Sequence, residues 1–217
     1  MTLVTIEKKK CACCNKIVAY DNLASCSVLG YGDLDFRKNI SLGGIVLDNE
    51  IEECPHCGYI STDIRYKTKE FDSFFSSELY GFYKDEWIGI NRTIQRFIKY
   101  AFFEEWRGNL DNAYRFYIKA AWKYDDLEDP KSAWQCRSRA ISLLKKIRNK
   151  SSKQILEMCD LYRRTEQFEE AIKVLDSFSE SFYIEDEIEM KIVKYQIYLC
   201  SWKDPSRHCV EEALWYE

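Results

Sequence analysis

Two pairs of cysteines constrain the fold of this 217-residue chain more than any other feature of its sequence. Cys11 and Cys14 lie in "CACCNK", and Cys54 and Cys57 lie in "CPHCGY". A tetrahedral zinc site needs four soft ligands that converge, and sequences commonly supply them as two such Cys-x-x-Cys pairs on opposed hairpin tips. The pattern therefore predicts that Cys11, Cys14, Cys54 and Cys57 meet at one Zn²⁺ ion.

The residue that follows each pair supports this prediction. Asn15 comes directly after the first pair and Gly58 directly after the second. The backbone must turn at these points to present N–H groups to thiolate sulfur, and Gly and Asn are the residues that tolerate a positive φ. We therefore expect two knuckles of similar conformation.

The spacer between the pairs is unusual. Thirty-nine residues separate Cys14 from Cys54, whereas a compact two-knuckle motif has about 15–20. An inserted hairpin or loop is expected over "LASCSVLGYGDLDFRKNISLGG". Cys13 and Cys26 are left over, and either could replace a ligand or remain a buried thiol. A second metal ion is not expected, because two thiols do not fill four coordination positions.

A redox role for the second pair is the alternative to zinc. Cys54-Pro-His-Cys57 is also the active-site tetrapeptide of oxidising thioredoxin-fold proteins, in which a helix N-terminus stabilises the first thiolate. Here Glu52 and Glu53 precede Cys54 and would raise its pKa, and Gly58 follows where a helix should continue. A second pair upstream is required for zinc and not for a redox dithiol, so zinc is preferred.

The remaining cysteines are expected to be core residues of a cytoplasmic protein. The N-terminus lacks the apolar stretch of a signal peptide, and no apolar run approaches the ~20 residues of a membrane-spanning helix. In a reducing compartment ten cysteines do not suggest a disulfide framework. The dispersed cysteines are Cys136, Cys159, Cys200 and Cys209.

Two regions of different composition predict a mainly α fold. Residues 1–62 carry short strand-like stretches, "KIVAY" and "GGIVLDNEIEE", and predict a small β-rich, zinc-ribbon-like module. Gly and Pro almost vanish from residues 63–217, where apolar residues recur at helical spacing. We therefore expect an all-helical domain over residues 63–217.

Two helical hairpins can be placed within the second region. The first turns at residues 107–109 and the second at residues 165–167, with the small residues Ala113 and Ala171 soon after. Small residues there allow paired helices to approach closely, as in tetratricopeptide-type repeats. The two alanines are further apart than one ~34-residue repeat, so another helical element is expected at about residues 130–147.

Several segments together resemble a group of uncharacterised bacterial proteins of unknown function: "CACCNK", "GDLDFR", "ECPHCGYIS", "AFFEEWRGNLDNAYRFYIKAAWKYDDLED" and "DLYRRTEQFEEAIKVL". The resemblance implies a split zinc ribbon, a zinc ion and a tetratricopeptide-like helical segment, and almost nothing about activity. The chain departs from that pattern at Asn15, where glycine is usual, and at Cys13, which adds a thiol to the first knuckle.

Residues suited to enzyme chemistry are few. His208 and Cys209 are adjacent and would point in different directions on a helix, so no catalytic pair is expected. Asp33 and Asp35 could form a carboxylate pair, but an Asp-rich loop closed locally by Arg37 is preferred. We therefore expect that the protein is not an enzyme.

Charge is unevenly distributed along the helical region. Residues 131–153 contain eight Lys or Arg and no acidic residue, and residues 180–189 are rich in Glu and Asp. The basic stretch could bind RNA, DNA or an acidic protein segment. The preferred interpretation is that the two stretches lie on neighbouring helices, where their fields largely cancel, since the chain is net acidic at −4.

The sequence thus favours a zinc-binding adaptor or scaffold. One structural Zn²⁺ per chain would hold the small module, and stacked hairpins would accept a protein or peptide in their groove. The first alternative is a nucleic-acid-binding zinc ribbon that uses Lys8, Lys9, Lys10 and residues 131–153. The second is a thiol-disulfide oxidoreductase that uses the Cys54–Cys57 dithiol.

Overall fold

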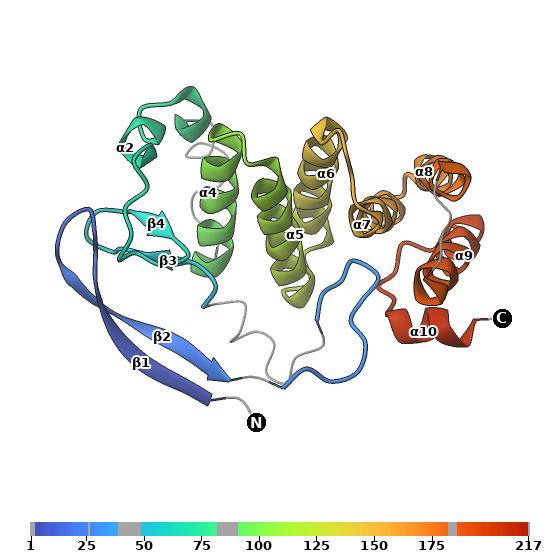
Figure 1. The fold of residues 1–217 in the computed structure, drawn as a ribbon, viewed down its shortest axis with the longest axis horizontal. Helices are drawn as coiled ribbons and strands as arrows, with labels where there is room; N and C mark the ends of the chain where they lie inside the picture. The colour runs from blue at the N-terminus through green and yellow to red at the C-terminus, as the bar shows by residue number, and fades with distance from the viewer. Residues whose placement is uncertain (1–2, 26, 39–48, 82–90, 182–185, 217) are drawn as a thin grey trace.

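A computed structural model of the chain describes residues 3–25, 27–38, 49–81, 91–181 and 186–216. It is mainly helical, with a small region of strands at the N-terminal end followed by helices that stand side by side (Figure 1). The predicted fold class is therefore confirmed.

Two short antiparallel pairs make up the strand region. Strand β1 (Leu3–Lys10) pairs with β2 (Ile17–Ser25), and β3 (Glu52–Glu53) pairs with β4 (Ile60–Ser61). Each pair is a hairpin whose connecting loop carries one cysteine pair. We call these four strands and their two connecting loops the strand module.

The two strand-like stretches have different outcomes. "KIVAY" enters β2, as predicted. In "GGIVLDNEIEE", residues 43–48 lie outside the described part of the chain, and strand structure among its described residues is limited to β3. A strand this short contributes little pairing energy, so other contacts must hold the second hairpin in place.

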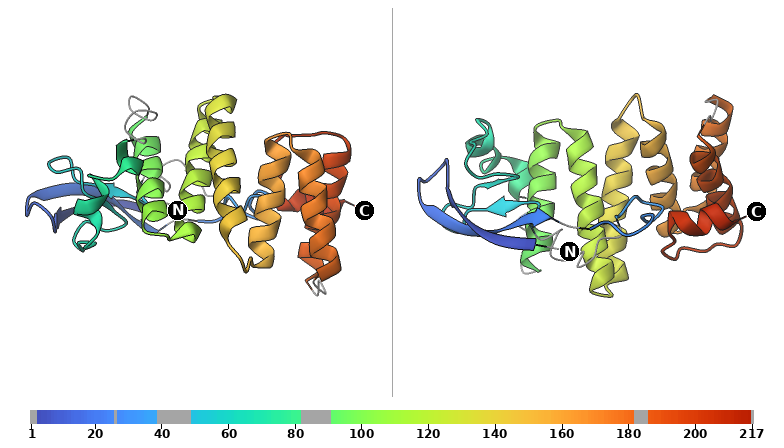
Figure 2. Two further views of the ribbon diagram at one scale, coloured as in Figure 1. Left: turned by 90° about the horizontal axis from the view of Figure 1, so that it is seen from above. Right: turned by 60° about the horizontal axis from the view of Figure 1, so that its bottom comes forward.

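The helices follow in chain order. They are α2 (Phe71–Phe74), α4 (Arg92–Trp106), α5 (Leu110–Asp126), α6 (Pro130–Lys146), α7 (Ser152–Arg164), α8 (Phe168–Ser181), α9 (Glu187–Ser201) and α10 (Val210–Trp215). From α4 to α10 each helix packs on the next, and we call this set the helical array (Figure 2). Both expected hairpins, α4–α5 and α7–α8, are present, and α6 is the additional element expected near residues 130–147. Among the described residues, no helix is both long enough and apolar enough to cross a membrane.

Three of the turns in the array share one conformation. Gly108, Glu128 and Glu166 have positive φ angles of 77°, 56° and 62°, respectively. The residue after each of them donates its backbone N–H to the carbonyl five residues earlier, at 2.8–2.9 Å. This bonding pattern is that of a Schellman motif, which satisfies the last carbonyls of a helix. Asn109 and Asp129 then cap the following helix, so each short turn both ends one helix and begins another.

Small residues lie between the paired helices, as predicted. Ala113 and Ala171 are fully buried, and so is Cys159. Cys136 and Cys200 are also core residues, whereas Cys209 is only half-buried. Close approach of helix backbones therefore depends on small side chains at these positions.

The strand module is attached to the first long helix by side chains of α4. Lys99 donates to the carboxylate of Glu53 at 2.7 Å and to the carbonyl oxygen of Gly58 at 2.8 Å. Arg96 donates to the carbonyl oxygen of Ile51 at 3.0 Å. Since Gly58 belongs to the second knuckle, these contacts hold that knuckle directly against the helical array.

Contacts cross the expected boundary at residue 62, and the division into two domains remains a prediction. Ala12, in the first knuckle, donates its N–H to the carbonyl oxygen of Ile64 at 2.8 Å. The N–H of Ile64 in turn donates to the carboxylate of Glu52 at 3.0 Å. Residue 64 thus belongs structurally with the strand module.

Candidate metal centre

The first knuckle is a tight turn between β1 and β2. Asn15 donates its N–H to the carbonyl oxygen of Cys11 at 2.9 Å, and the N–H of Cys11 donates to the carbonyl oxygen of Lys16 at 2.9 Å. Asn15 has a φ of 63°. An asparagine is among the few residues other than glycine that adopt this conformation readily.

The second knuckle repeats this bonding between β3 and β4. Gly58 donates to the carbonyl oxygen of Cys54 at 2.8 Å, and Cys54 donates to that of Tyr59 at 2.8 Å. Gly58 has a φ of 72°. The two knuckles therefore have the same conformation at equivalent positions, as the residues after each cysteine pair predicted.

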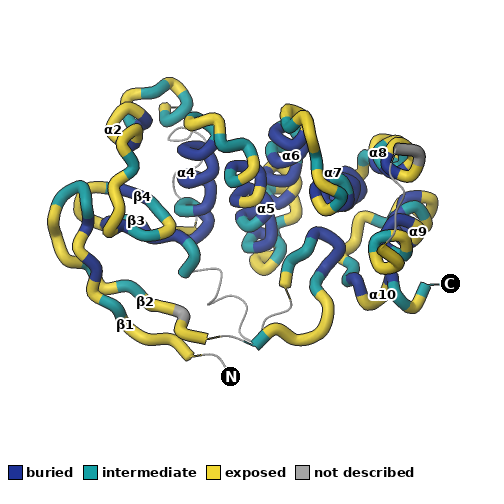
Figure 3. Tube along the Cα trace, viewed as in Figure 1, coloured by how far each residue is buried: buried dark blue, intermediate teal, exposed yellow. Residues whose placement is uncertain are grey.

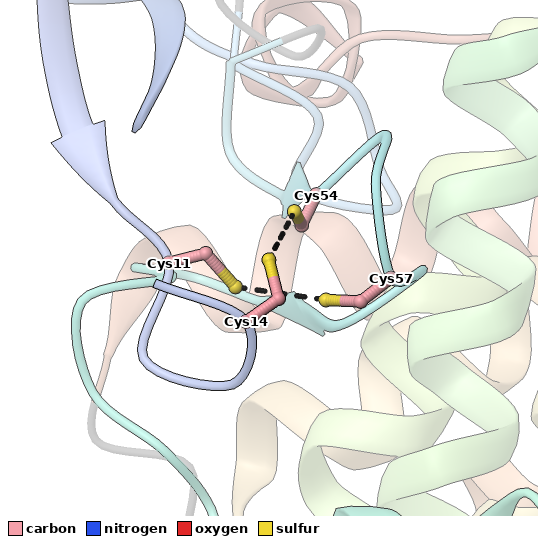
Figure 4. Close-up of side chains that lie close together, drawn as sticks. All are labelled: Cys11, Cys14, Cys54 and Cys57. Atoms are coloured by element: carbon pink, nitrogen blue, oxygen red, sulfur yellow. Dashed lines mark hydrogen bonds between the residues drawn. The ribbon is translucent and has the colours of Figure 1, made fainter. Parts of the chain in front are cut away.

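The four predicted cysteines come together, one knuckle facing the other (Figure 4). The Sγ atoms of Cys11 and Cys57 are 3.7 Å apart, and those of Cys14 and Cys54 are 3.6 Å apart. All four sulfur atoms lie within 4.8 Å of one another. Four thiolates bound to one zinc at ~2.3 Å would be about 3.8 Å apart at the corners of a tetrahedron. The arrangement therefore fits a metal ion with four sulfur ligands.

No disulfide joins these four cysteines, which are all free thiols. The short sulfur–sulfur contacts given above also join one knuckle to the other. Convergence of two pairs is what a metal centre needs.

Backbone N–H groups and burial act on the thiols in opposite directions. The N–H of Lys16 faces the sulfur of Cys14 and lowers the pKa of that thiol to about 7. Burial raises the pKa of Cys54 and Cys57, although N–H groups of their own knuckle face both sulfurs. A bound dication would favour the thiolate form of all four, so metal binding would release protons.

A buried ion pair fixes the two hairpins to each other beneath the site. Lys9 on β1 pairs with Glu52 on β3, and both side chains are almost fully buried. Tyr20 on β2 adds a hydrogen bond from its hydroxyl to the carbonyl oxygen of Glu53 at 3.0 Å. These contacts hold β3 at the first hairpin, which positions the second knuckle opposite the first.

The two leftover cysteines are placed differently. Cys13 is half-buried and lies outside the four-sulfur cluster. Burial raises the pKa of Cys13 to about 11, and Lys67 and Asp72 are the charged side chains near it. Cys26 lies outside the described residues.

His208 and Cys209 lie in the loop that leads into α10. The His208 ring lies 3.1 Å from the Tyr195 hydroxyl through Nδ1 and 3.0 Å from the Asp204 carboxylate through Nε2. Cys209 precedes α10 as its N-cap residue. The ring therefore ties α9 to the loop before α10.

Arg37 closes the "GDLDFR" loop locally through its backbone: its carbonyl oxygen accepts the Asp33 N–H at 2.9 Å, and its N–H donates to the Asp35 carboxylate at 3.3 Å. The Arg37 side chain pairs outside the loop. Its guanidinium binds both carboxylate oxygens of Asp126 on α5, at 2.8 Å. Asp33 instead pairs with Arg207 at 2.7 Å, and Asp35 accepts a hydrogen bond from Trp122 at 2.6 Å. These partners are distant in sequence, so no local pattern could have identified them.

The basic stretch of residues 131–153 has several partners inside the molecule. Arg137 forms a two-fold ion pair with Asp125, and Arg139 binds Glu105 at 2.9 Å. These acidic residues belong to α5 and α4. In the acidic stretch of residues 180–189, Glu189 accepts a hydrogen bond from the Ser152 hydroxyl at 2.7 Å.

Comparison of the chain with models of protein families, with curated proteins and with solved structures finds no match in any of the three.

Proposed function

We propose that this chain is a zinc-binding protein-interaction protein, an adaptor or scaffold of the cytoplasm. One structural Zn²⁺, bound by Cys11, Cys14, Cys54 and Cys57, holds the strand module against a helical array that binds a partner. The observation that carries the zinc half of this proposal is the convergence of four sulfur atoms from two equivalent knuckles.

The donor set supports a closed, structural site. Four-sulfur tetrahedral sites select Zn²⁺ or iron, and zinc bound by four thiolates has no open position for a substrate water. Two of the ligands, Cys11 and Cys54, are fully buried. The resemblance to bacterial proteins with a split zinc ribbon agrees with this proposal.

Exposed aromatic residues support a role in protein interaction. Trp202 and Trp215 are 72% and 80% exposed, and Tyr198, whose ring centre lies 6.3 Å from that of Trp202, is 38% exposed. All three lie on or beside the last two helices, at the end of the array opposite the strand module (Figure 1). Large exposed apolar side chains grouped in this way mark interaction surfaces, and arrays of helices commonly bind proteins.

The two alternatives have less support. A nucleic-acid binder would use Lys8, Lys9, Lys10 and residues 131–153, and within that set Lys9, Arg137 and Arg139 are engaged in ion pairs. A thiol oxidoreductase needs a first thiol of lowered pKa, whereas burial raises that of Cys54.

Native mass spectrometry tests the zinc assignment. We expect one zinc per chain in the wild type and none in the Cys54→Ser, Cys57→Ser double variant. Cys13→Ser is the matched control, because it removes a thiol of the first knuckle that lies outside the cluster. Loss of zinc in that control, or a folded wild type without metal, would contradict the assignment.

Capture of binding proteins by the purified chain tests the adaptor role. Trp202→Ala combined with Trp215→Ala removes the most exposed aromatic surface while leaving the core intact. A partner captured by the wild type and lost in this variant supports the role. Binding to heparin or RNA that weakens steeply with salt would favour the nucleic-acid alternative instead.

A further inference from the structure

Residues 32–37, here called the inner segment, leave the strand module and lie against the helical array. They lie near α5, α7 and the loop before α10, and much of the segment is buried (Figures 1 and 3). The N–H of Leu34 donates to the carbonyl oxygen of His208 at 3.0 Å, and the N–H of Val210 donates to that of Gly32 at 2.8 Å. The contact is thus an isolated antiparallel bridge between Asp33 and Cys209.

The inner segment is a self-contained turn. Asp33 donates its N–H to the carbonyl oxygen of Arg37 at 2.9 Å, and Phe36 donates to that of Asp33 at 2.8 Å. Gly32 is required, since a Cβ there would lie 2.5 Å from the carbonyl oxygen of Arg37. The turn therefore depends on bonds within itself and can exist as a recognition motif.

The two acidic side chains of the segment each have a cationic partner on the array. Asp33 binds the guanidinium of Arg207 at 2.7 Å. Asp35 is buried completely, accepts a hydrogen bond from the indole N–H of Trp122 at 2.6 Å and lies 3.4 Å from a nitrogen of Arg164. A carboxyl group buried to this extent requires such partners.

The other side chains of the inner segment also contact the helical array or are buried. Leu34 is only 1% exposed. The ammonium of Lys153 lies 4.7 Å from the centre of the Phe36 ring. Arg37 binds Asp126 through two hydrogen bonds. The array thus recognises an acidic, an apolar, an acidic, an aromatic and a basic side chain in succession.

The surface that binds the segment is organised independently of it. Arg164 is also held by Asp125 at 3.0 Å, and Asp125 binds Arg137 as well. These three residues belong to α5, α6 and α7. Arg164 would therefore stay in position if the segment left, because its second carboxylate partner is part of the array.

The ends of the segment are held by contacts close to solvent. The side chains of Arg207 and Asp126 on the array are 49% and 35% exposed, whereas those of Asp33 and Arg37 in the segment are 9% and 11% exposed. Solvent reaches one member of each of these two ion pairs, so they are the contacts that a competing ligand meets first.

We propose that the inner segment occupies, within its own chain, a peptide-binding site of the helical array, and that the partner is a protein segment of the same chemistry. That segment carries Asp, an apolar residue, Asp and an aromatic residue in a tight turn. The inference rests on the proposed adaptor function and names the site and the kind of partner.

Binding of a labelled peptide with the sequence of residues 31–38 tests the proposal. The released variant carries Leu34→Ser, Asp35→Ser and Arg37→Ser, which frees the site, and its folding is checked by circular dichroism and zinc content. We expect the peptide to bind this variant roughly tenfold or more tightly than the wild type, because the wild-type site is already filled.

Two controls locate the binding. A peptide with Asp35→Ala should bind the released variant roughly tenfold more weakly, since the Trp122 N–H and Arg164 then lack their acceptor. Adding Trp122→Phe to the variant should weaken the unaltered peptide similarly, because the ring stays and its donor is lost. A folded released variant that binds no peptide overturns the proposal.

If the released variant does not fold, hydrogen exchange of the wild type tests whether the peptide displaces the inner segment. Excess peptide should accelerate exchange at the amides of Asp33, Leu34 and Phe36 and leave those of Cys11 and Cys54 unchanged. No acceleration overturns the site assignment. If the peptide does not bind but the wild-type chain still captures a protein, the peptide site is wrong and the adaptor function is still supported.

Discussion

At the scale of single residues, Glu157 on α7 is the buried acid with the clearest consequence for stability. Its carboxyl accepts a hydrogen bond from the Tyr114 hydroxyl at 2.9 Å. Burial raises the pKa of Glu157 to about 7, and nearby Asp35 acts in the same direction, whereas the Tyr114 hydrogen bond, Lys153 and Arg115 oppose the shift. The folded protein therefore keeps a proton on Glu157 between about pH 4.5 and 7 that the unfolded chain has already lost.

This proton makes stability depend on pH. The contribution of Glu157 falls as pH rises from about 4.5 to 7 and is constant above that, with a total near 3 kcal/mol for a shift of this size. Glu157→Gln should remove this slope. Urea denaturation of both proteins between pH 4.5 and 8 measures it, and equal slopes in the two would show that Glu157 is already ionised in the folded state.

Glu166 gives a second prediction at the same scale. It holds a positive φ of 62° in the turn between α7 and α8, where glycine has no steric penalty. The left-handed conformation costs a residue other than glycine roughly 1–2 kcal/mol, and the greater backbone entropy of glycine offsets about 0.5–1 kcal/mol of this. Glu166→Gly should therefore stabilise the protein by about 0.5–1 kcal/mol. Gln135→Gly, at an exposed position inside α6, should destabilise it by a similar amount. Denaturant midpoints measure both, and two changes of the same sign would contradict the role of the turn conformation.

At the scale of elements, the strand module has little secondary structure to hold it folded. Its second hairpin has only two residues in each strand, and short two-stranded pairs are marginally stable in water. The contacts that hold it are the knuckle bonds, the Lys9–Glu52 ion pair and the attachment of Lys99 to Gly58. Metal binding would supply the remaining free energy of folding.

Removal of the metal should therefore unfold one element and spare the others. We expect a strong chelator to make residues 3–25 and 49–64 sensitive to protease while the far-ultraviolet helix signal persists. Most residues of the hydrophobic core belong to the helical array, which should keep the array folded. Limited proteolysis with and without chelator measures this effect, and continued protection of both segments without metal would be evidence against a structural role.

At the scale of the whole molecule, the long spacer between the cysteine pairs connects the two ends of the fold. The chain leaves the first knuckle, reaches the loop before α10 and returns to the second knuckle (Figure 1). Closing a longer loop adds little entropic cost, about 0.6 kcal/mol for each doubling of length. The spacing that looked unusual for a zinc motif is thus explained by the inner segment.

The sequence by itself predicted the structural features that depend on residues close together in the chain. The positive φ of Asn15 and Gly58, the α4–α5 and α7–α8 hairpins and the position of α6 follow from local steric and hydrophobic preferences. The meeting of the four cysteines was also predicted, because zinc chemistry imposes one geometry on two pairs.

Only the tertiary structure decided which charged groups meet. The guanidinium of Arg37 binds Asp126 on α5, and Asp33 binds Arg207 from the other end of the chain. Within the basic stretch, Arg137 and Arg139 likewise pair with acidic residues of α5 and α4. An ion pair carries no sequence period, and its partner is set by which surfaces the packed helices bring within a few ångströms.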